Sequence, residues 1–207
     1  MYKKIDLNSW ERKHHYWIFK DALIPHYQVT LRLDITHFKK ATKAKGLPFS
    51  LAFIHVVTEV ANEQKEFRYR FLTGDVVLYD VIHPSFTVLE KETDLFKVIN
   101  AQFTEDIYEF VQQAQQQIAL QEQYITGPPA NDVFQFSSLP LVDFTQITHT
   151  YAGKSEKSNP MFDWGKYTEV EGVITMPFAI QVHHSFIDGI HVGYFVEQLQ
   201  RRLNEWS

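Results

Sequence analysis

The sequence predicts a single domain of the α+β or mixed α/β class. Segments in which apolar and polar residues alternate, as in β-strands, are interspersed with segments whose apolar residues recur at helical spacing. Of the 207 residues, 44% are hydrophobic and 15% aromatic, which suffices for a substantial core. No internal repeat and no long, compositionally biased linker divides the chain. We therefore expect one domain over residues 1–207.

The first part of the chain predicts helix, strand and helix in turn. Ser9 is placed to cap a helix from Trp10 to about Lys20. The segment HYQVTLRLDI then alternates like a strand with one buried face. Thr36 begins a short basic helix.

A core helix and a series of strands follow. From Pro48 to Gln64, apolar residues at three-and-four spacing, many of them small or β-branched, indicate a helix buried on most sides. FRYRFLTGDVVLYD predicts two strands around a Thr-Gly-Asp turn, and SFTVLEKE and LFKVINAQF continue the strand pattern. These segments build a sheet.

The last part of the chain adds two helices and completes the sheet. A glutamine-rich helix from Thr104 to about residue 122 ends before the break Gly127-Pro128-Pro129. DVFQFSSL resumes the sheet, and a hairpin with Glu171-Gly172 in its turn joins DWGKYTEV to GVITMPFAIQV. One face of a final helix carries the apolar residues Val192, Phe195, Leu199, Leu203 and Trp206.

Composition narrows the possible functions. The chain has no cysteine, which excludes disulfides, thiolate nucleophiles and cysteine metal sites, and a cytoplasmic location is expected. The formal net charge is −5 and lysines are interspersed with acids, so no nucleic-acid partner is expected. The N-terminus lacks an apolar signal segment, and the longest apolar runs are far shorter than a bilayer, so no membrane association is expected.

The stretch QVHHSFIDGIHVG, residues 181–193, concentrates the polar groups most typical of a site. If a strand ends here, His183 and His184 point to opposite faces and do not bind one ion. In a helix, His184, Asp188 and His191 would share a metal-binding face, but the residues between them are poor helix formers. No metal site is therefore expected.

A structural role for this stretch is the alternative to catalysis. Asp188 is suited to cap the final helix, with the histidines as packed, hydrogen-bonded groups. This interpretation leaves unexplained why two imidazoles end a strongly apolar strand, because a buried ring needs partners for both nitrogens. From the motif alone, catalysis and structure both stay open.

The same stretch resembles the active-site signature of the chloramphenicol acetyltransferases. Its looser part, His-x-x-x-Asp-Gly, is shared with dihydrolipoyl acyltransferases and peptide-synthetase condensation domains. Resemblance to the acetyltransferases covers nearly the whole chain and includes SWERKHHYWIF, EFRYRFLTGDVVLYDVIHPSFTVLEKET, SSLPLVDFT and MFDWGKYTEVEGVITMPFAIQVHH. It implies a two-layer fold with a mixed β-sheet flanked by helices, assembled as a homotrimer with active sites at subunit interfaces.

The resemblance assigns the catalytic roles. His184 matches the general base, and histidine, with an ordinary pKa of about 6.5, suits proton transfer from an alcohol at neutral pH. Ser137, in Ser-Ser-Leu-Pro, matches the hydroxyl that stabilises the oxyanion. Asp188 and Arg12 match an ion pair that holds the loop of the base and takes no part in proton transfer.

Binding residues follow from the same matches. The acceptor pocket is implied at Phe19, Leu23, Tyr27 and Phe96, and the coenzyme side at Lys166 and Tyr167.

The chain also departs from the family pattern. Asp163 stands where the family has a threonine that positions a water, and His149 where it has an apolar pocket wall. Ile190 and Leu141 replace aromatic residues. If Asp163 and His149 both face the pocket, they either satisfy each other or await a polar substrate.

The expected function is O-acetyl transfer from acetyl-coenzyme A to a hydroxyl of chloramphenicol or a related small alcohol, by direct attack with a histidine base and without a metal. Two alternatives are the same fold acting on a different, more polar acceptor, and a small-molecule binder without catalysis.

Overall fold

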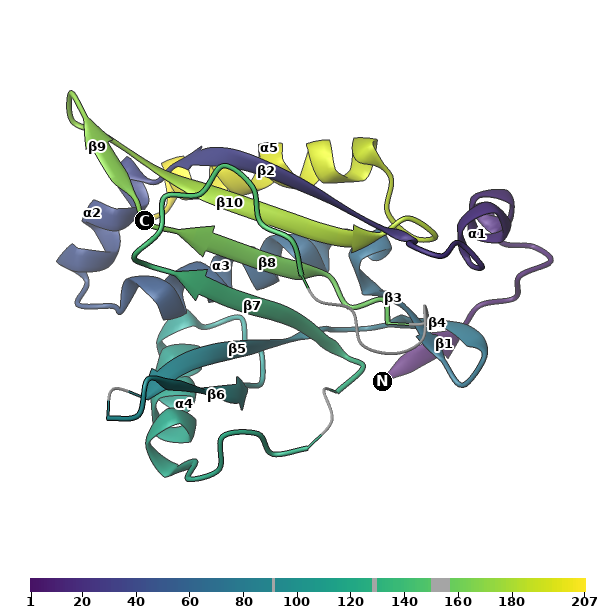
Figure 1. Cartoon of the computed structure of the whole chain (residues 1–207), viewed down its shortest axis with the longest axis horizontal. Coiled ribbons are helices and arrows are strands. Elements are labelled where there is room, and N and C mark those ends of the chain that lie inside the picture. The colour runs from purple at the N-terminus through teal and green to yellow at the C-terminus, as the bar shows by residue number, and fades with distance from the viewer. Residues whose placement is uncertain (91, 128–129, 150–156) are drawn as a thin grey trace.

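Two β-sheets, with helices packed against the larger one, make up the structure (Figure 1). It is a computed structural model that describes residues 1–90, 92–127, 130–149 and 157–207; Pro128 and Pro129 of the expected chain break lie outside the described residues. The helices are α1 (Lys13–Phe19), α2 (Thr36–Ala44), α3 (Phe49–Glu63), the short 3₁₀ helix η1 (Lys65–Arg68), α4 (Ile107–Leu120) and α5 (Gly189–Glu205). The strands are β1 (Tyr2–Lys4), β2 (His26–Asp34), β3 (Tyr69–Leu72), β4 (Asp75–Tyr79), β5 (His83–Glu90), β6 (Leu95–Asn100), β7 (Val133–Leu139), β8 (Met161–Gly165), β9 (Thr168–Val170) and β10 (Val173–His183).

The larger sheet is mixed, as the sequence predicts. Its strand order is β2-β10-β8-β7-β5-β6, and β9 pairs with β10 beside this row. β7 runs parallel to both β5 and β8, whereas the other pairs are antiparallel. A smaller sheet has the order β1-β4-β3. The expected class, a mixed sheet flanked by helices, is confirmed.

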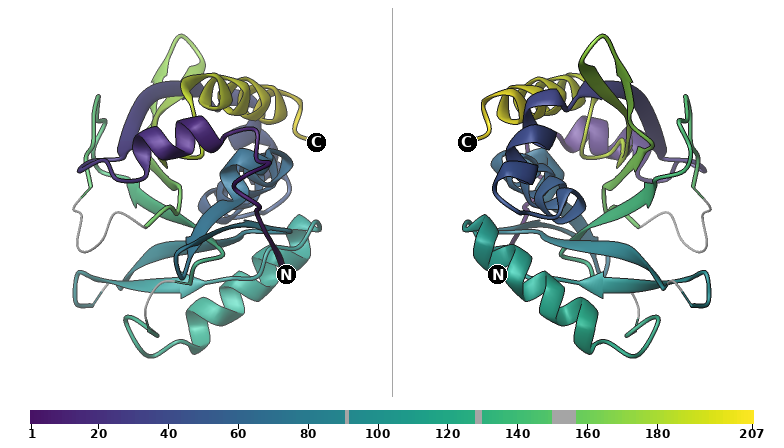
Figure 2. Two further views of the ribbon diagram at one scale, coloured as in Figure 1. Left: turned by 90° about the vertical axis from the view of Figure 1, so that its right-hand side faces the viewer. Right: turned by 90° about the vertical axis from the view of Figure 1, so that its left-hand side faces the viewer.

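The two faces of the larger sheet differ in chemistry. On one face, Phe162 of β8 contacts Phe195 of α5, and Phe178 of β10 contacts Phe53 of α3. Because side chains alternate along a strand, Asp163 and its neighbours two residues away point to the opposite face. Figure 2 shows α3, α4 and α5 on one side of this sheet, while the segment after β7 runs along the other. The polar face is therefore the one available for a site.

The segment after β7 crosses the polar face at close range. A Cβ at Gly165 would lie 2.4 Å from the carbonyl oxygen of Val142 and 2.9 Å from the ring of Phe144. The backbone N–H of Lys166 donates to the same Val142 carbonyl at 2.8 Å. Glycine at this position thus lets residues 142–144 lie directly on β8, and the chain continues from there to His149.

A buried arginine fixes the start of β7. Arg70 is 0% exposed, and its guanidinium donates to the carbonyls of Phe67, Tyr69, Asn131 and Val133 at 2.8 to 3.1 Å. Burial lowers the pKa of Arg70 to about 9, so the group remains a cation at neutral pH. Carbonyl dipoles from two segments therefore stabilise one buried charge, which anchors the strand that carries Ser137.

Two expected helix boundaries are wrong. The first helix begins at Lys13 instead of Trp10, and Ser9 does not cap it, because the Ser9 hydroxyl donates to the carboxylate of Asp6. The expected helix from Thr104 begins at Ile107, because the carboxylate of Asp106 accepts the backbone N–H groups of Tyr108 and Glu109. At α1 no side chain caps the helix, whereas at α4 Asp106 takes the capping role expected of Thr104.

The other expected elements are confirmed. α3 is buried along almost its whole length, as its apolar, small and β-branched residues predicted. The turn between β9 and β10 holds Glu171 at φ 50° and Gly172 at φ 81°, and two successive positive φ values are typical of a tight hairpin. On α5, the predicted apolar face is buried at Val192, Phe195, Leu199 and Leu203. Trp206, expected on the same face, follows the end of the helix at Glu205 and is half-buried.

Candidate active site

The candidate base lies just after the end of β10. Pairing of β10 with β2 ends at His183 and His26, and the backbone N–H of His184 then donates to the carbonyl of Pro25 at 2.8 Å. His183 is 1% exposed, whereas the side chain of His184 is 35% exposed. The two adjacent histidines thus lie in different environments, and the one that reaches solvent is His184.

Two aromatic rings hold the imidazole of His184. The ring of Phe19, at the end of α1, stacks on it with centroids 3.9 Å apart and planes 5° apart. Tyr27 of β2 contacts it at 4.8 Å, and the Tyr27 hydroxyl donates to the carbonyl of Ile187 at 3.4 Å. Burial, reinforced by the charge of Asp188, raises the pKa of Tyr27 to about 12, so its hydroxyl stays neutral. These contacts limit rotation of the imidazole.

An ion pair secures the loop between His184 and α5. Arg12 donates two hydrogen bonds to the carboxylate of Asp188, at 2.8 and 3.1 Å. Burial alone would raise the pKa of Asp188, but hydrogen bonding and charge from Arg12 outweigh it and lower the pKa below its ordinary value. Oδ1 of Asp188 lies 3.2 Å from Nδ1 of His184, without the angle of a hydrogen bond. The aspartate therefore faces the Nδ1 side of the ring.

The helical metal face considered for this stretch does not form. α5 begins at Gly189, so His184 lies outside the helix. Nδ1 of His191 instead accepts the backbone N–H of Asp188 at 2.9 Å, at the start of α5. Burial lowers the pKa of His191, which favours the neutral ring that this bond requires. Among the described residues, no group of three or more histidine or acidic side chains could hold a metal ion.

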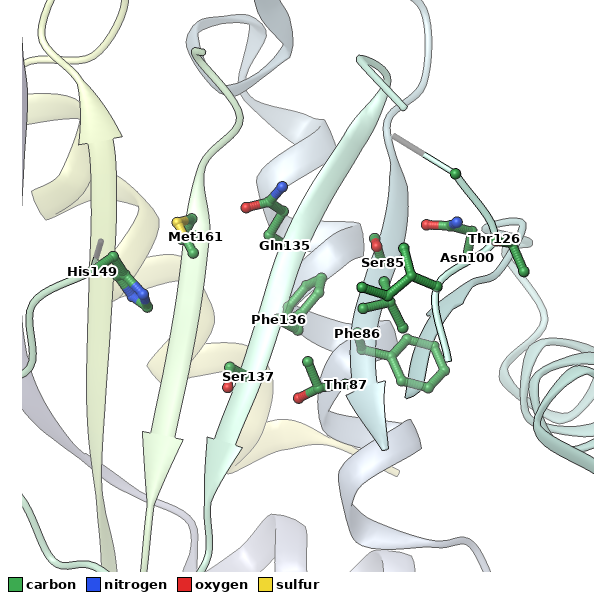
Figure 3. Close-up of a pocket in the computed structure, with 13 residues that line it drawn as sticks. Ser85, Phe86, Thr87, Asn100, Thr126, Gln135, Phe136, Ser137, His149 and Met161 are labelled. Carbon is green, nitrogen blue, oxygen red and sulfur yellow. The ribbon is translucent and has the colours of Figure 1, made fainter. Parts of the chain in front are cut away.

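A pocket on the polar face of the sheet is lined by two of the predicted residues, Ser137 and His149. Its cavity volume is about 370 Å³, and its lining includes Ser85 and Thr87 of β5, Gln135 and Ser137 of β7, Met161 of β8 and His149 (Figure 3). Phe86, Phe136 and Ile125 contribute apolar surface. Small-molecule sites combine apolar walls with a few polar groups in this way.

Asp163 and His149 pair with each other, as in one of the two expected arrangements. Nε2 of His149 lies 2.7 Å from Oδ2 of Asp163, whose side chain is 1% exposed. Asp163 is opposite Ser137 in the register of β7 and β8. Of the two residues, His149 lines the pocket.

Within one chain, the candidate base His184 and the candidate oxyanion donor Ser137 are far apart. Ser137 is opposite Asp163, Asp163 is opposite Ala179 of β10, and the chain then runs on to His184. At about 3.3 Å per residue and about 4.8 Å between strands, the backbones of Ser137 and His184 are roughly 20 Å apart. No small substrate bridges that distance, so one chain does not bring both groups to one reacting centre.

The remaining predicted residues lie outside these two clusters. Leu23, after α1, is 96% exposed, and Phe96 on β6 is 54% exposed. Lys166 is also exposed; Tyr167 is 46% exposed and has the ammonium group of Lys39 4.2 Å from its ring centroid.

Sequence reasoning missed part of the pocket floor. Ser85, Thr87, Gln135 and Asn100 line the pocket but were not singled out. Their signal was present, because polar residues at alternate positions of otherwise apolar strands mark one face of a sheet. What the pattern lacked was the order of the strands, which brings these positions side by side.

Comparison with known proteins agrees with this architecture. The sequence matches the family profile described as CAT, chloramphenicol acetyltransferase, over residues 1–200. A chloramphenicol acetyltransferase of Escherichia coli is 33% identical over 209 residues, covering 100% of this chain and 95% of that protein. One of Clostridium perfringens is 30% identical over 209 residues, covering 98% and 95%.

Solved structures of acetyltransferases share the fold of this chain. A probable dihydrolipoamide acetyltransferase from Listeria monocytogenes shares the fold, with a TM-score of 0.65 at 15% identity over 99% of this chain and 95% of that chain. A chloramphenicol acetyltransferase structure has a TM-score of 0.89 at 31% identity and covers 98% of this chain and 100% of that chain.

The fold and the profile define an acyltransferase of the coenzyme A-dependent class, which confirms the expectation of an enzyme. Within that class, the chain belongs to the chloramphenicol acetyltransferase family. No helix among the described residues is long and apolar enough to cross a membrane.

Proposed function

We propose that this protein transfers the acetyl group of acetyl-coenzyme A to a hydroxyl of a small alcohol, with chloramphenicol as the first acceptor to test. Similarity to enzymes of that name supports the acceptor. The partly exposed imidazole of His184, stacked on Phe19 and faced by Asp188 on its Nδ1 side, supports a general base. This observation carries the proposal.

The geometry suggests one sequence of proton transfers. With Nδ1 turned to the carboxylate of Asp188, the proton of a neutral His184 stays on Nδ1, and Nε2 accepts the proton of the acceptor hydroxyl. The acceptor oxygen attacks the thioester carbon as it loses that proton. The Ser137 hydroxyl donates to the resulting oxyanion. When the carbon–sulfur bond breaks, His184 returns the proton to the thiolate, and no acyl-enzyme forms.

A homotrimer with shared sites accounts for the separation of roughly 20 Å between Ser137 and His184. We propose that the base of one subunit faces the pocket of its neighbour, so that each site takes one group from each chain. Lys166 and Tyr167 would then hold the coenzyme, because an exposed cation suits phosphate groups and an exposed aromatic face suits a base.

The test measures release of free coenzyme A thiol from acetyl-coenzyme A across a panel of alcohols that includes chloramphenicol. Acetyl transfer to at least one alcohol is expected. A protein whose melting temperature rises with ligand but which releases no thiol would be a binder, and the proposal would be wrong.

Shared sites have their own test. His184→Ala and Ser137→Ala subunits are mixed, dissociated and reassembled. Hybrid trimers contain interfaces with both native groups, so activity should recover above that of either variant alone. As the matched control, the double variant reassembled with wild type forms no such extra sites. Absence of recovery in verified hybrids, or a mass other than a trimer, would contradict the shared site.

A further inference from the structure

His149 and Asp163 form a largely buried pair beside the pocket. Asp163 is 0% exposed, and its Oδ2 is 2.7 Å from Nε2 of His149. Its other oxygen, Oδ1, is buried and has no hydrogen-bond partner in the described part of the chain. Burying a carboxylate is costly, and a structural pair would use its full hydrogen-bonding capacity. The geometry points to a function for this pair.

The register of the sheet places the pair beside the oxyanion donor. Asp163 is opposite Ser137, and one step along the same face Met161 is opposite Gln135. Gln135 is opposite Ser85, which is opposite Asn100. The pocket floor is thus a row of hydroxyl and carboxamide groups, with His149 at its β8 side (Figure 3). Asp163 of β8 pairs with His149 there.

One nitrogen of His149 is left for a ligand. Nε2 is engaged by Asp163, and Nδ1 makes no hydrogen bond with any described residue. Asp163 fixes the orientation of the ring, and His149 lines the pocket. A neutral ring with its proton on Nε2 presents an acceptor at Nδ1, and a charged ring presents a donor. A hydroxyl group pairs with either form, because it both donates and accepts.

We propose that His149, positioned by Asp163, binds a second hydroxyl of the acceptor and so selects alcohols that carry at least two hydroxyl groups. His149 is then a specificity-determining residue and Asp163 a positioning residue. This inference rests on the proposed acetyl transfer, since the first hydroxyl is the one that reacts beside Ser137. The second hydroxyl only binds and takes part in no bond making or breaking.

The experiment uses acceptors that differ by one hydroxyl. Chloramphenicol, a diol, is compared with its derivative lacking the secondary hydroxyl, and 3-phenylpropane-1,2-diol with 3-phenylpropan-1-ol. For wild type, we expect kcat/KM to favour each diol by about 10- to 100-fold, the range for one hydrogen bond to a charge-assisted group.

The main variant is His149→Leu combined with Asp163→Thr, which leaves no buried carboxylate unpaired. Its preference for the diol should fall to about one in both pairs of acceptors. Asp163→Asn should reduce the preference to an intermediate value, because the amide still reaches Nε2 but orients the ring less strongly. Met161→Leu, on the same strand and also lining the pocket, is the matched control and should keep the wild-type preference.

Binding measured by calorimetry without acetyl-coenzyme A separates the proposed acetyl transfer from the proposed role of His149 in binding a second hydroxyl. If wild type releases no thiol with any acceptor, the proposed transfer fails, and calorimetry still reports whether the diol binds more tightly through His149. If transfer occurs but the double variant, shown to fold by its melting curve, keeps the diol preference, the role of His149 is overturned. Loss of the preference in both assays supports it.

Discussion

Arg12 donates two hydrogen bonds to the carboxylate of Asp188, and these bonds join residues 176 positions apart in the chain. The guanidinium side chain is 9% exposed and the carboxylate 25%. Since Asp188 also faces Nδ1 of His184 at 3.2 Å, the first helical segment is tied to the loop that carries the candidate base.

His184→Ala should reduce acetyl transfer by at least about 10²- to 10⁴-fold, because it removes the only proposed proton acceptor. Thiol release measures the loss, and the melting curve should stay close to wild type because the side chain is partly exposed. The comparison is His183→Ala, which should act mainly on stability, since His183 is 1% exposed. Substantial turnover in His184→Ala would assign the base elsewhere.

Ser137→Ala should lower kcat by about 10²-fold with little change in affinity for the coenzyme, because the hydroxyl acts on the oxyanion of the transition state. Steady-state kinetics and direct coenzyme binding measure the two quantities separately. Ser138→Ala, on the opposite side of the same strand, is the matched control. Weaker coenzyme binding with unchanged kcat would contradict the assignment of Ser137.

Arg12→Ala and Asp188→Asn should each reduce kcat, by roughly 10- to 100-fold, through displacement of His184. Their effects on the free energy of unfolding should be less than additive in the double variant, because both break the same pair. Chemical denaturation of the four proteins gives the coupling energy. Full additivity would show that the two residues act independently.

The same ion pair predicts a pH dependence of stability. Asp188 has a lowered pKa in the folded protein, so its stabilising contribution is complete above the ordinary carboxyl pKa of 3.8. Below pH 3.8 that contribution is lost as the pH falls toward the lower folded value. The difference in melting temperature between wild type and Asp188→Asn should therefore be constant from pH 7 to about 5 and shrink below about 4. A constant difference down to pH 3 would disprove the shift.

Gly165→Ala should destabilise the protein by about 1 to 3 kcal/mol, because the new methyl group would lie 2.4 Å from the Val142 carbonyl oxygen and force the crossing segment off β8. Thermal and denaturant unfolding measure the change. Gly193→Ala is the control: nothing lies within 4 Å of its Cβ position, and in the interior of α5 alanine should stabilise by up to about 1 kcal/mol. Equal effects at both positions would contradict the crowding at Gly165.

The sequence by itself predicted most of the elements and the proximity of His184 to Asp188. The burial of α3 and the turn at Glu171 and Gly172 follow from periodicity and backbone preference, which depend on neighbours along the chain. His184 and Asp188 are four residues apart, so their proximity is also local. Helix starts were less predictable: Ser9 does not cap α1, because its hydroxyl donates to the carboxylate of Asp6.

Only the tertiary structure decided which distant side chains meet. The order β10-β8-β7 puts Asp163 beside Ser137, and the crossing at Gly165 leads the chain on to His149, which pairs with Asp163. The same strand order places Ser137 roughly 20 Å from His184, although the sequence assigned both to one reaction. Strand order and loop paths are set by long-range packing of apolar faces. Polar groups from distant segments meet where that packing brings them together, and no pattern along the chain predicts those meetings.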